Sequence, residues 1–522
     1  MTDASIALNR FGMGARPGES AGRDPRQWLK AQLDRFDPTP QPAASLTPST
    51  QIVADFAQYQ EQQRLLRQEY GPRRQPVGAA RPAAVQPPAA QSAPAMQEGA
   101  TMQPGAAMTA SVPAPETMAP SRQQMPLNPL EESRRQARRQ AQDRYVLAVS
   151  TRALLAITSP TPFAERLSHF WANHFAVSAD KLELIGLAGT LEFEAIRPHV
   201  MGKFGDMLNA VERHPAMLLY LDQAQSIGPN SPAGLQAQRR GNNRRAGLNE
   251  NLAREIMELH TLGVRSVYNQ ADVTEFARAM TGFTVNGLGR ARDRAGPLGS
   301  GPVGSFLFLD RIHEPGTRTI LGKSWREHGE AQAGSVLDFY ATHPATAKHI
   351  AAKLARHFAA DDPPPALVAR LQQAFLSSGG DLPTVYRALI DSPECWTPQP
   401  AKFKSPWEWS ISAMRALGTQ QVQPQAVNGL MNQLGQPVWK PGSPAGWDDV
   451  AGAWAGPDAV MRRVEAAERM AQRSRDTIDA RQRAAELFPG ALSEGTAQSI
   501  ARAESPGQGL ALMLVSPEFM RR

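Results

Sequence analysis

The 522-residue sequence contains a single cysteine, Cys395, and no long apolar run. One cysteine excludes an intramolecular disulfide and any zinc site built from several thiolates. No run of about 18 apolar residues is present, so we expect no membrane-spanning helix. The first residues, MTDASIALNRFGMG, have neither the apolar segment of a secretory signal nor a twin-arginine pair. We therefore expect a cytoplasmic protein.

Familiar catalytic motifs are missing as well. The sequence has no phosphate-binding loop, no H-E-x-x-H and no G-x-S-x-G. GMGARPG near the start lacks the preceding strand and the spaced acidic residue of a dinucleotide fingerprint. No reaction is therefore identified by motif.

The net charge of +7 is spread along the whole chain. The arginine clusters lack the interleaved aromatic residues on which single-stranded nucleic acids stack. We therefore expect no specific binding of nucleic acid.

Proline and glycine, by contrast, are plentiful, with 44 and 41 residues. Residues 71–129 are rich in Pro, Ala, Gln and Met and contain almost no aromatic or β-branched side chains. Such a segment buries too little apolar surface to offset the entropy of ordering it. We predict a long disordered insertion between two helices, which are the arms of a helical hairpin.

A variant that lacks residues 71–129 is expected to fold like the full chain. Long surface loops carry only a small entropic penalty, so removing one changes stability little. The melting temperature of the deletion variant tests this, and a fall of many degrees would show that the segment is part of the folded structure.

Helical periodicity dominates the remaining sequence. The predicted helices are 139–157, 162–178, 189–198, 202–213, 249–262, 272–281, 331–342, 344–358, 364–378 and 382–391. The segment 305–323 favours a short β-hairpin with EPGT as its turn. The expected fold is mainly α, a multi-helix globular protein. Its predicted parts are an N-terminal helical part at 1–70, a helical core with the polar motifs at 130–395, and a C-terminal helical part at 396–522 packed on that core.

The segment NENLAREIMELHTLGV, residues 249–264, contains many polar groups in one predicted helix. At 100° per residue, His260 lies in the middle of the apolar face. Glu250, Arg254 and Glu258 follow one another at i, i+4 spacing on another face. Because Glu258 and His260 lie about 160° apart on a regular helix, they do not share a metal ion unless the helix is interrupted there.

The segment ERLSHFWANHFAV, residues 165–177, places His174 at the centre of its apolar face in the same way. A buried histidine is usually a core residue with a hydrogen-bond partner, since an unpartnered imidazole is costly. Two such histidines also fit a polar pocket, and both interpretations stay open. If helices 162–178 and 249–262 pack together, about 8–10 Å apart, His174 and His260 share one buried site.

Other polar side chains are candidates for the same pocket. His313 lies at the predicted hairpin turn. His349, Lys353 and His357 recur at i, i+4 and i+8 on the border of an apolar face. A solvated flank is the more usual role of such a row, and a contribution to the site is the alternative.

These residues and their neighbours form the predicted site. The predicted catalytic residues are His174, His260, Glu250, Asn173 and His313. The predicted substrate-binding residues are Arg254, Asn249, Asn251 and Trp171. Histidine and glutamate serve as general base and acid near neutral pH or bind a divalent metal, and asparagine orients a substrate or stabilises an oxyanion. The metal ligands, if a metal is bound, are not identified by the sequence.

Several segments together resemble the uncharacterised bacterial proteins grouped as domain of unknown function 1800. The matching segments are NRFGMGARPGE, FWANHF, LNENLAREIMELHTLGV, YNQADVTEFARAMTGF, HEPGTRTILGK, HPATAKHIAAKLARHFAADDPP, KFKSPWEW, GQPVWKP and SPEFMRR. They cover nearly the whole chain apart from the proline-rich insertion. Members are often encoded beside a sulfatase-like family with twin-arginine signals. The resemblance therefore implies a sulfatase-like partner, and co-export with that partner is an alternative to a cytoplasmic location.

Two functions of different class follow. The first is an enzyme, a hydrolase with a His/Glu/Asn pocket that works by acid–base chemistry or with a metal. The second is a non-catalytic helical protein that binds the co-encoded partner and uses the buried polar groups to specify its core. A concave pocket at the histidines favours the first, and large exposed apolar patches favour the second.

Overall fold

A computed structural model describes residues 1–70, 128–241, 247–288, 301–474 and 477–522. Most of the predicted insertion, residues 71–127, lies outside the described part of the chain. The chain divides into two compact units. The first contains residues 1–60 and 136–522, and the second contains residues 61–135.

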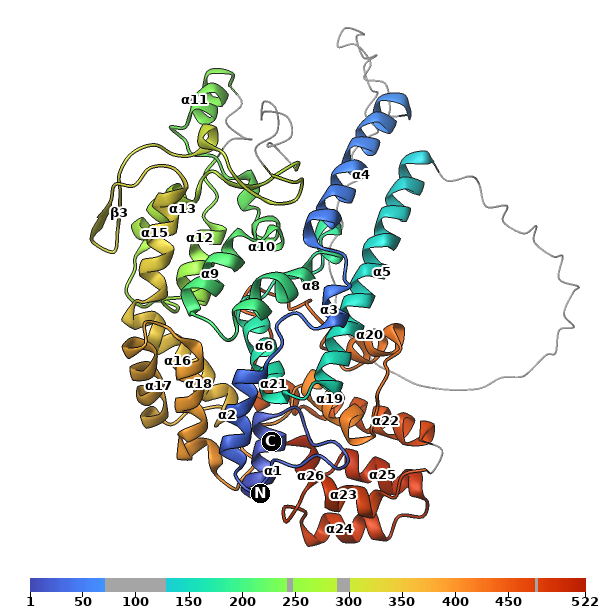
Figure 1. The fold of residues 1–522 in the computed structure, drawn as a ribbon. Helices are drawn as coiled ribbons and strands as arrows, with labels where there is room; N and C mark the ends of the chain where they lie inside the picture. Colours follow the sequence, from blue (N-terminus) through green and yellow to red (C-terminus); the bar gives the residue numbers. More distant parts are fainter. Residues whose placement is uncertain (71–127, 242–246, 289–300, 475–476) are drawn as a thin grey trace, which may run out of the picture. The chain divides into compact units, whose positions relative to one another are not determined.

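Helices make up most of the chain, as Figure 1 shows, and a mainly α fold is confirmed. The first elements are α1 (Asp3–Ile6), the π-helix η1 (Ala7–Phe11), α2 (Pro25–Arg35), α3 (Gln41–Ala44) and α4 (Ser49–Tyr70). They are followed by α5 (Pro129–Thr158), α6 (Pro162–His174), α7 (Leu182–Ile185), α8 (Ala188–Thr190), η2 (Leu191–Ile196), η3 (Arg197–His199), α9 (Phe204–Arg213), α10 (Pro215–Tyr220), η4 (Gln223–Gln225), α11 (Pro232–Arg239), α12 (Asn251–Glu255), η6 (Ile256–His260) and α13 (Gln270–Met280).

The rest of the first unit begins with four short strands and continues as helices. The strand region contains β1 (Phe283–Val285), β2 (Phe306–Phe308), η7 (Asp310–Ile312), β3 (Arg318–Ile320) and β4 (Lys323–Trp325). The helices are α15 (Glu330–Ala341), α16 (Pro344–Phe358), α17 (Pro365–Ser377), α18 (Leu382–Asp391), η8 (Pro393–Trp396), α19 (Pro406–Ala416), α20 (Pro424–Gln433), α21 (Ala451–Trp454), α22 (Pro457–Arg473), α23 (Ala480–Leu487), α24 (Glu494–Ala501), α25 (Pro506–Leu514) and α26 (Pro517–Met520).

A small hairpin occurs near residues 305–323, but its turn is not the predicted EPGT. β3 pairs antiparallel with β4 across a two-residue turn formed by Leu321 and Gly322. Both turn residues have positive φ angles, +51° and +71°, as a tight turn between twisted strands requires. β2 pairs instead with β1, which precedes it in the chain. The two strands on either side of EPGT therefore belong to different hairpins.

Two helices of the first unit, α6 and α19, are buried almost all round. Each begins with a proline in its first turn, and the side chain of Ser405 caps α19 in a capping box with Glu408. α6 nevertheless carries Arg166, and α19 carries Arg415. Because a buried charge is tolerated only when it is paired, these helices position a network of ion pairs inside the protein.

The predicted helix 249–262 is shorter than expected and changes its winding. It is α-helical as α12 and then becomes the π-helix η6, which ends at His260. Gly263 follows with a φ angle of +92°, and its N–H donates to the Met257 carbonyl oxygen at 3.1 Å. π-Helical turns are rare and occur often at functional sites.

The second unit includes the end of α4 and the start of α5. The Gln63 side chain donates to the Leu130 carbonyl oxygen at 3.0 Å, and the Ser133 hydroxyl donates to Gln62 Oε1 at 3.0 Å. Within this unit the two helix ends therefore lie side by side, as expected of the arms of a hairpin.

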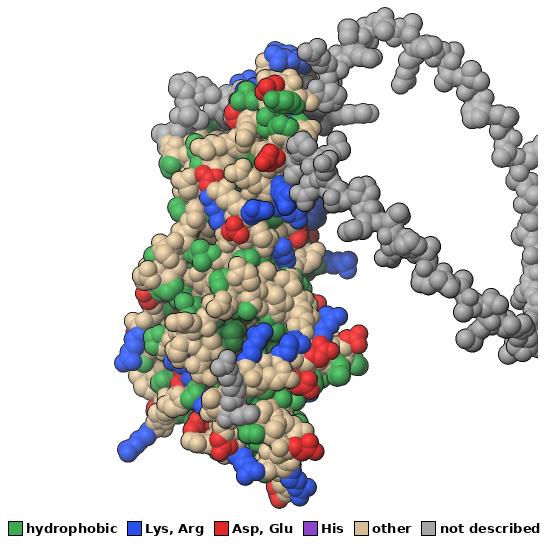
Figure 2. Space-filling model, turned by 90° about the vertical axis from the view of Figure 1, so that its right-hand side faces the viewer, with side chains coloured by type: hydrophobic (Ala, Val, Ile, Leu, Met, Phe, Trp, Pro, Cys, Tyr) green, Lys and Arg blue, Asp and Glu red, His purple; other side chains and the backbone are tan. Residues whose placement is uncertain are grey.

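The surface in Figure 2 carries Lys and Arg side chains interspersed with Asp and Glu side chains. The absence of specific nucleic-acid binding stays a prediction. None of the helices in the described ranges combines the length and the apolar character that a membrane crossing needs.

Candidate functional site

A cavity of about 350 Å³ lies in the first unit among α6, α16, the start of α19 and the segment 436–450. Its volume suits a small ligand. Four histidines contribute to its wall, namely His169, His174, His349 and His357. The charged residues of the wall are Arg152, Arg166, Lys353, Arg356, Glu408, Asp448 and Asp449. The cavity is therefore lined by titratable groups drawn from distant parts of the sequence.

Helical spacing explains how α6 and α16 supply so many of these groups. Arg166, His169 and Asn173 recur at i, i+3 and i+7 and lie on one face of α6. His349 and His357 lie two turns apart on α16, with Lys353 between them. The row on α16 was interpreted from sequence as a solvated flank. The structure corrects this, because all three of its side chains line the cavity.

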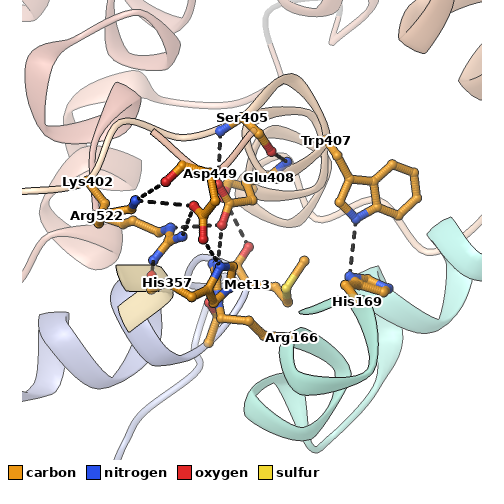
Figure 3. A network of polar contacts seen from close by, with 12 residues as sticks. Met13, Arg166, His169, His357, Lys402, Ser405, Trp407, Glu408, Asp449 and Arg522 are labelled. Atoms are coloured by element: carbon orange, nitrogen blue, oxygen red, sulfur yellow. Dashed lines mark hydrogen bonds and ion pairs between the residues drawn. The ribbon is translucent and has the colours of Figure 1, made fainter. Parts of the chain in front are cut away.

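His357 and Asp449 form a hydrogen-bonded pair in the wall of the cavity (Figure 3). The Nδ1–H group of His357 donates to Asp449 Oδ2 at 2.7 Å. Burial lowers the pKa of His357 below its usual 6.5, and the carboxylate of Asp449 opposes this shift. The imidazole is therefore neutral near pH 7, with its proton on Nδ1 and a lone pair on Nε2. That Nε2 atom is buried without a hydrogen-bond partner among the described residues.

Two cations behind the cavity wall, Lys402 and Arg522, keep Asp449 negatively charged. Lys402 Nζ lies 3.2 Å from Asp449 Oδ1 and donates to the Asp449 carbonyl oxygen at 2.6 Å. Arg522 Nη2 lies 3.9 Å from Asp449 Oδ1. Burial alone would raise the pKa of Asp449, but His357, Lys402 and Arg522 together lower it well below its usual value. Asp449 therefore stays charged and fixes the orientation of the imidazole.

Glu408 is a second carboxylate of the cavity wall, and unlike Asp449 it is buried. Arg166 Nη1 donates to Glu408 Oε1, and Arg522 Nε lies 2.8 Å from the same oxygen. The backbone N–H of Ser405 donates to Glu408 Oε2 at 2.9 Å. Burial would raise the pKa of Glu408, but Arg522 and Arg166 lower it well below its usual value. Arg522 also donates to the His357 carbonyl oxygen at 2.6 Å, so it links both carboxylates to α16.

His169 lies beside Trp407 on another side of the cavity (Figure 3). The indole N–H of Trp407 donates to His169 Nδ1 at 3.2 Å. Burial, together with the charges of Arg152, Arg197 and Arg166, lowers the pKa of His169 well below its usual value. The ring is therefore neutral and carries its proton on Nε2, which is buried and has no partner in the described structure. His169 is thus a free hydrogen-bond donor.

Asn173 positions the segment that closes the cavity. Its side-chain N–H donates to the Trp447 carbonyl oxygen at 2.8 Å, and its Oδ1 accepts from the Trp447 N–H at 2.7 Å. Gly446 passes so close that an added Cβ would lie 2.3 Å from the Asn173 carbonyl oxygen, and its φ angle is +81°. Only glycine fits there, and the Asn173 amide holds the backbone of Trp447 through both its nitrogen and its oxygen.

His174 and His260 lie close together, as the sequence predicts, with ring centroids 6.2 Å apart. They meet at the end of η6, where the last backbone carbonyl groups have no N–H partner within the helix. His174 Nε2–H donates to the His260 carbonyl oxygen at 3.1 Å, and His349 Nε2–H donates to the Leu259 carbonyl oxygen at 3.0 Å. Burial lowers the pKa of both rings, that of His349 to about 4. These two neutral histidines therefore cap the π-helix from the cavity side.

The side chain of His260 has a different partner. Its Nδ1–H group donates to Glu212 Oε1 at 2.8 Å, and both side chains are fully buried. His260 is not among the residues that line the cavity. Of the predicted pair, only His174 therefore reaches the cavity directly.

The other predicted site residues lie outside the cavity wall. Glu250 accepts from Thr274 and Gln270 and pairs with Arg254, which also pairs with Glu258. Glu258 pairs with Arg254 and His260 with Glu212, so the two side chains have different partners despite the π-helical interruption. The catalytic role of Glu250 and the substrate-binding role of Arg254 stay predictions.

The remaining predicted residues make local structural contacts. Asn249 donates to the Leu221 carbonyl oxygen at 3.0 Å and accepts from the Asn251 N–H. The Trp171 indole donates to the Tyr386 hydroxyl at 2.6 Å in the core. His313 donates to the Thr281 carbonyl oxygen at 2.7 Å. Trp171 packs edge-on against His174, with ring centroids 5.2 Å apart, but none of these residues lines the cavity.

Sequence reasoning missed most of the charged network. Arg166, His169, Glu408, Asp449 and Arg522 were not predicted, and the signal for them is weak. Arg166 and His169 lie in ERLSHFWANHF and Glu408 lies in KFKSPWEW, two segments rich in aromatic residues, where a buried charge is unusual. Among the described residues no group of three or more His, Cys, Asp or Glu side chains is placed to bind a metal ion.

The chain matches the family model described as "Protein of unknown function (DUF1800)" over residues 6–521. The match covers nearly the whole chain, so the protein belongs to this family, and the resemblance seen in its motifs is confirmed. Comparisons with curated proteins and with solved structures found no match.

Proposed function

We propose that this protein is a hydrolase in which His357 acts as general base in the cavity. The observation that carries the proposal is the pair of His357 and Asp449. A neutral imidazole with a free Nε2, held by a carboxylate at Nδ1, is the arrangement that removes a proton from water near neutral pH. Asp449 is the positioning residue, since it fixes the tautomer and stabilises the imidazolium that forms.

The proposed step is the attack of water on an ester, amide or related bond. His357 Nε2 takes one proton from the water as its oxygen bonds to the electrophilic atom of the substrate. The imidazolium then returns this proton to the leaving group as the scissile bond breaks, so atoms and charge balance. Water is the assigned nucleophile because Ser405, the hydroxyl residue of the described cavity wall, accepts the Glu408 N–H as a helix cap.

N–H donors of the cavity wall stabilise the negative charge that develops in this step. Arg166 Nη2 and His169 Nε2 are buried N–H groups without hydrogen-bond partners among the described residues. Preorganised donors of this kind act strongly in a site that excludes water. Both lie on the same face of α6, with His357 on the neighbouring helix α16.

The distribution of exposed apolar side chains also supports an enzyme. In the described structure they come singly or in pairs from separate segments, at Leu65, Tyr70, Leu147, Leu235, Val264, Val267, Leu376, Met461 and Leu512. The cavity, by contrast, gathers four histidines and several charged groups. Binding of a sulfatase-like partner stays a prediction of the family resemblance.

The test is a panel of chromogenic carboxylic esters, phosphate esters, sulfate esters and glycosides. The wild-type protein and the double variant His357→Gln/Asp449→Asn are purified identically, so that a contaminating hydrolase is seen in both. We expect the wild type to hydrolyse at least one class faster than the double variant does. Equal rates on all classes would contradict a hydrolase built on this pair.

The activity is expected to fall on the acid side of pH 6.5. His357 works only as the neutral base, and burial places its pKa below 6.5. The base form therefore predominates above pH 6.5 and is lost as the pH falls through the pKa of His357 in the folded protein. The profile of kcat/KM against pH measures this, and an activity that increases continuously from pH 7 to pH 5 would contradict it.

A further inference from the structure

The carboxylates of the cavity wall are already neutralised by cations behind them. Glu408 meets Arg166 and Arg522, and Asp449 meets Lys402 and Arg522. Asp448, the remaining carboxylate of the described wall, is solvent-exposed. The acidic groups therefore leave little negative charge to offset the other cations of the cavity.

Several of those cations have no carboxylate partner. Lys353 lines the cavity and makes no hydrogen bond or ion pair to any residue that the structure describes, although the charge of Asp449 favours its protonated form. Arg356 donates only to the Asp361 carbonyl oxygen. Behind Glu408, Lys404 and Arg463 are fully buried over the rings of Phe519 and Phe403. Among the described residues neither of the two forms an ion pair with a carboxylate.

The histidines respond to the same positive field. Besides burial, the charge of Lys353 lowers the pKa of His174, and Lys353 and Arg356 lower that of His349. Arg522 and Arg166 likewise lower the pKa of His357. All four histidines of the wall are held neutral, so they add hydrogen-bonding capacity without adding charge. An anion in the cavity would meet cations and N–H donors on several sides.

We propose that the substrate of this cavity carries an oxyanionic group, a carboxylate or a phosphate, which binds to Lys353, while Arg166 and His169 remain free for the charge that develops in the reaction. Lys353 offers an ammonium on α16, and the buried guanidinium and imidazole N–H groups of Arg166 and His169 lie on α6 in the same cavity wall. Charge-assisted hydrogen bonds of this kind are the strong ones, and arginine and lysine are the usual partners of carboxylate and phosphate. This inference rests on the proposed function, because it names the substrate class of the same cavity.

The test measures binding by calorimetry, independent of turnover. Succinate and inorganic phosphate are the anionic probes, and succinamide is the neutral match to succinate. The proteins are the wild type, Lys353→Met, Lys353→Arg and His357→Gln. The control is Lys348→Met, which removes an exposed cation from the same helix. Melting curves show that each variant is folded.

We expect the wild type to bind at least one of the two anions and not succinamide. Lys353→Met is expected to weaken that binding roughly 10- to 100-fold, the usual effect of losing one charge-assisted hydrogen bond. Lys353→Arg retains most of the affinity, and Lys348→Met binds like the wild type. Which anion binds more tightly distinguishes a carboxylate from a phosphate substrate.

The inference is overturned if neither anion binds at millimolar concentrations, if succinamide binds equally well, or if Lys353→Met binds like the wild type. His357→Gln separates this inference from the proposed function. Anion binding that persists in that variant supports the substrate class even when no hydrolysis is found. Hydrolysis of neutral substrates without anion binding would support the enzyme and reject the substrate class.

Discussion

Replacing His357 by glutamine is expected to lower kcat/KM of the hydrolytic activity by about 10²- to 10⁴-fold, the usual contribution of a general base. Glutamine fills a similar volume and can still donate a hydrogen bond to Asp449, but it cannot accept a proton at neutral pH. The fold should therefore survive while the chemistry is lost. Initial rates on the best substrate of the hydrolase panel, together with a melting curve, measure the two effects separately.

The matched control is His328→Gln, which changes an exposed histidine outside the cavity. It should leave kcat/KM unchanged. A fall of kcat/KM in His328→Gln equal to that in His357→Gln, or full activity in His357→Gln, would reject His357 as the base. Asp449→Asn should also lower kcat, because an amide no longer favours the tautomer with the proton on Nδ1.

Glu408→Gln is expected to destabilise the protein by about 3–5 kcal/mol, the usual loss when one partner of a buried ion pair is removed. The substitution leaves Arg166 and Arg522 buried without their shared carboxylate. Because the pKa of Glu408 is lowered in the folded state, its contribution is present above its unfolded pKa and is lost as the pH falls through the folded value. The loss should therefore be seen fully at pH 7.

Denaturant unfolding at pH 7 measures this difference. Glu468→Gln is the matched control, since it makes the same chemical change at an exposed position on α22. Its free energy of unfolding should stay within about 0.5 kcal/mol of the wild-type value. An equally small change for Glu408→Gln would mean that the buried network contributes nothing to folding and that the two arginines find other partners.

Local pattern predicted much of the fold. The helices at 344–358 and 382–391 have the predicted bounds, because each combines an apolar stripe with a clear N-terminal signal and no competing long-range constraint. The same kind of pattern predicted that His174 and His260 lie close together, since each is at the centre of the apolar face of its helix. The hairpin turn was placed wrongly because strand pairing is decided by contacts that are distant in sequence, here between β1 and β2.

The candidate site was predicted only in part, and the reason is physical. Helical periodicity shows which face of a helix is buried but not which buried charge will meet another. Glu408 and Arg166 are 242 positions apart, and His357 and Asp449 are 92 apart. Lys353 and His357 lie on the border of an apolar face, where a solvated flank and a cavity wall have the same sequence pattern. The family motifs FWANHF and KFKSPWEW held a signal that was used only for the first, since Asn173 and Glu408 from these two segments line the same cavity.

The most direct test of the account is a crystal structure of the His357→Gln variant with the best substrate of the panel bound. The account predicts that the substrate occupies the cavity between α6 and α16. Its scissile bond should lie close enough to residue 357 for one water molecule to bridge them, with reacting atoms about 3–3.5 Å apart. A substrate bound elsewhere on the protein, or one whose scissile bond points away from residue 357 and Asp449, would contradict it.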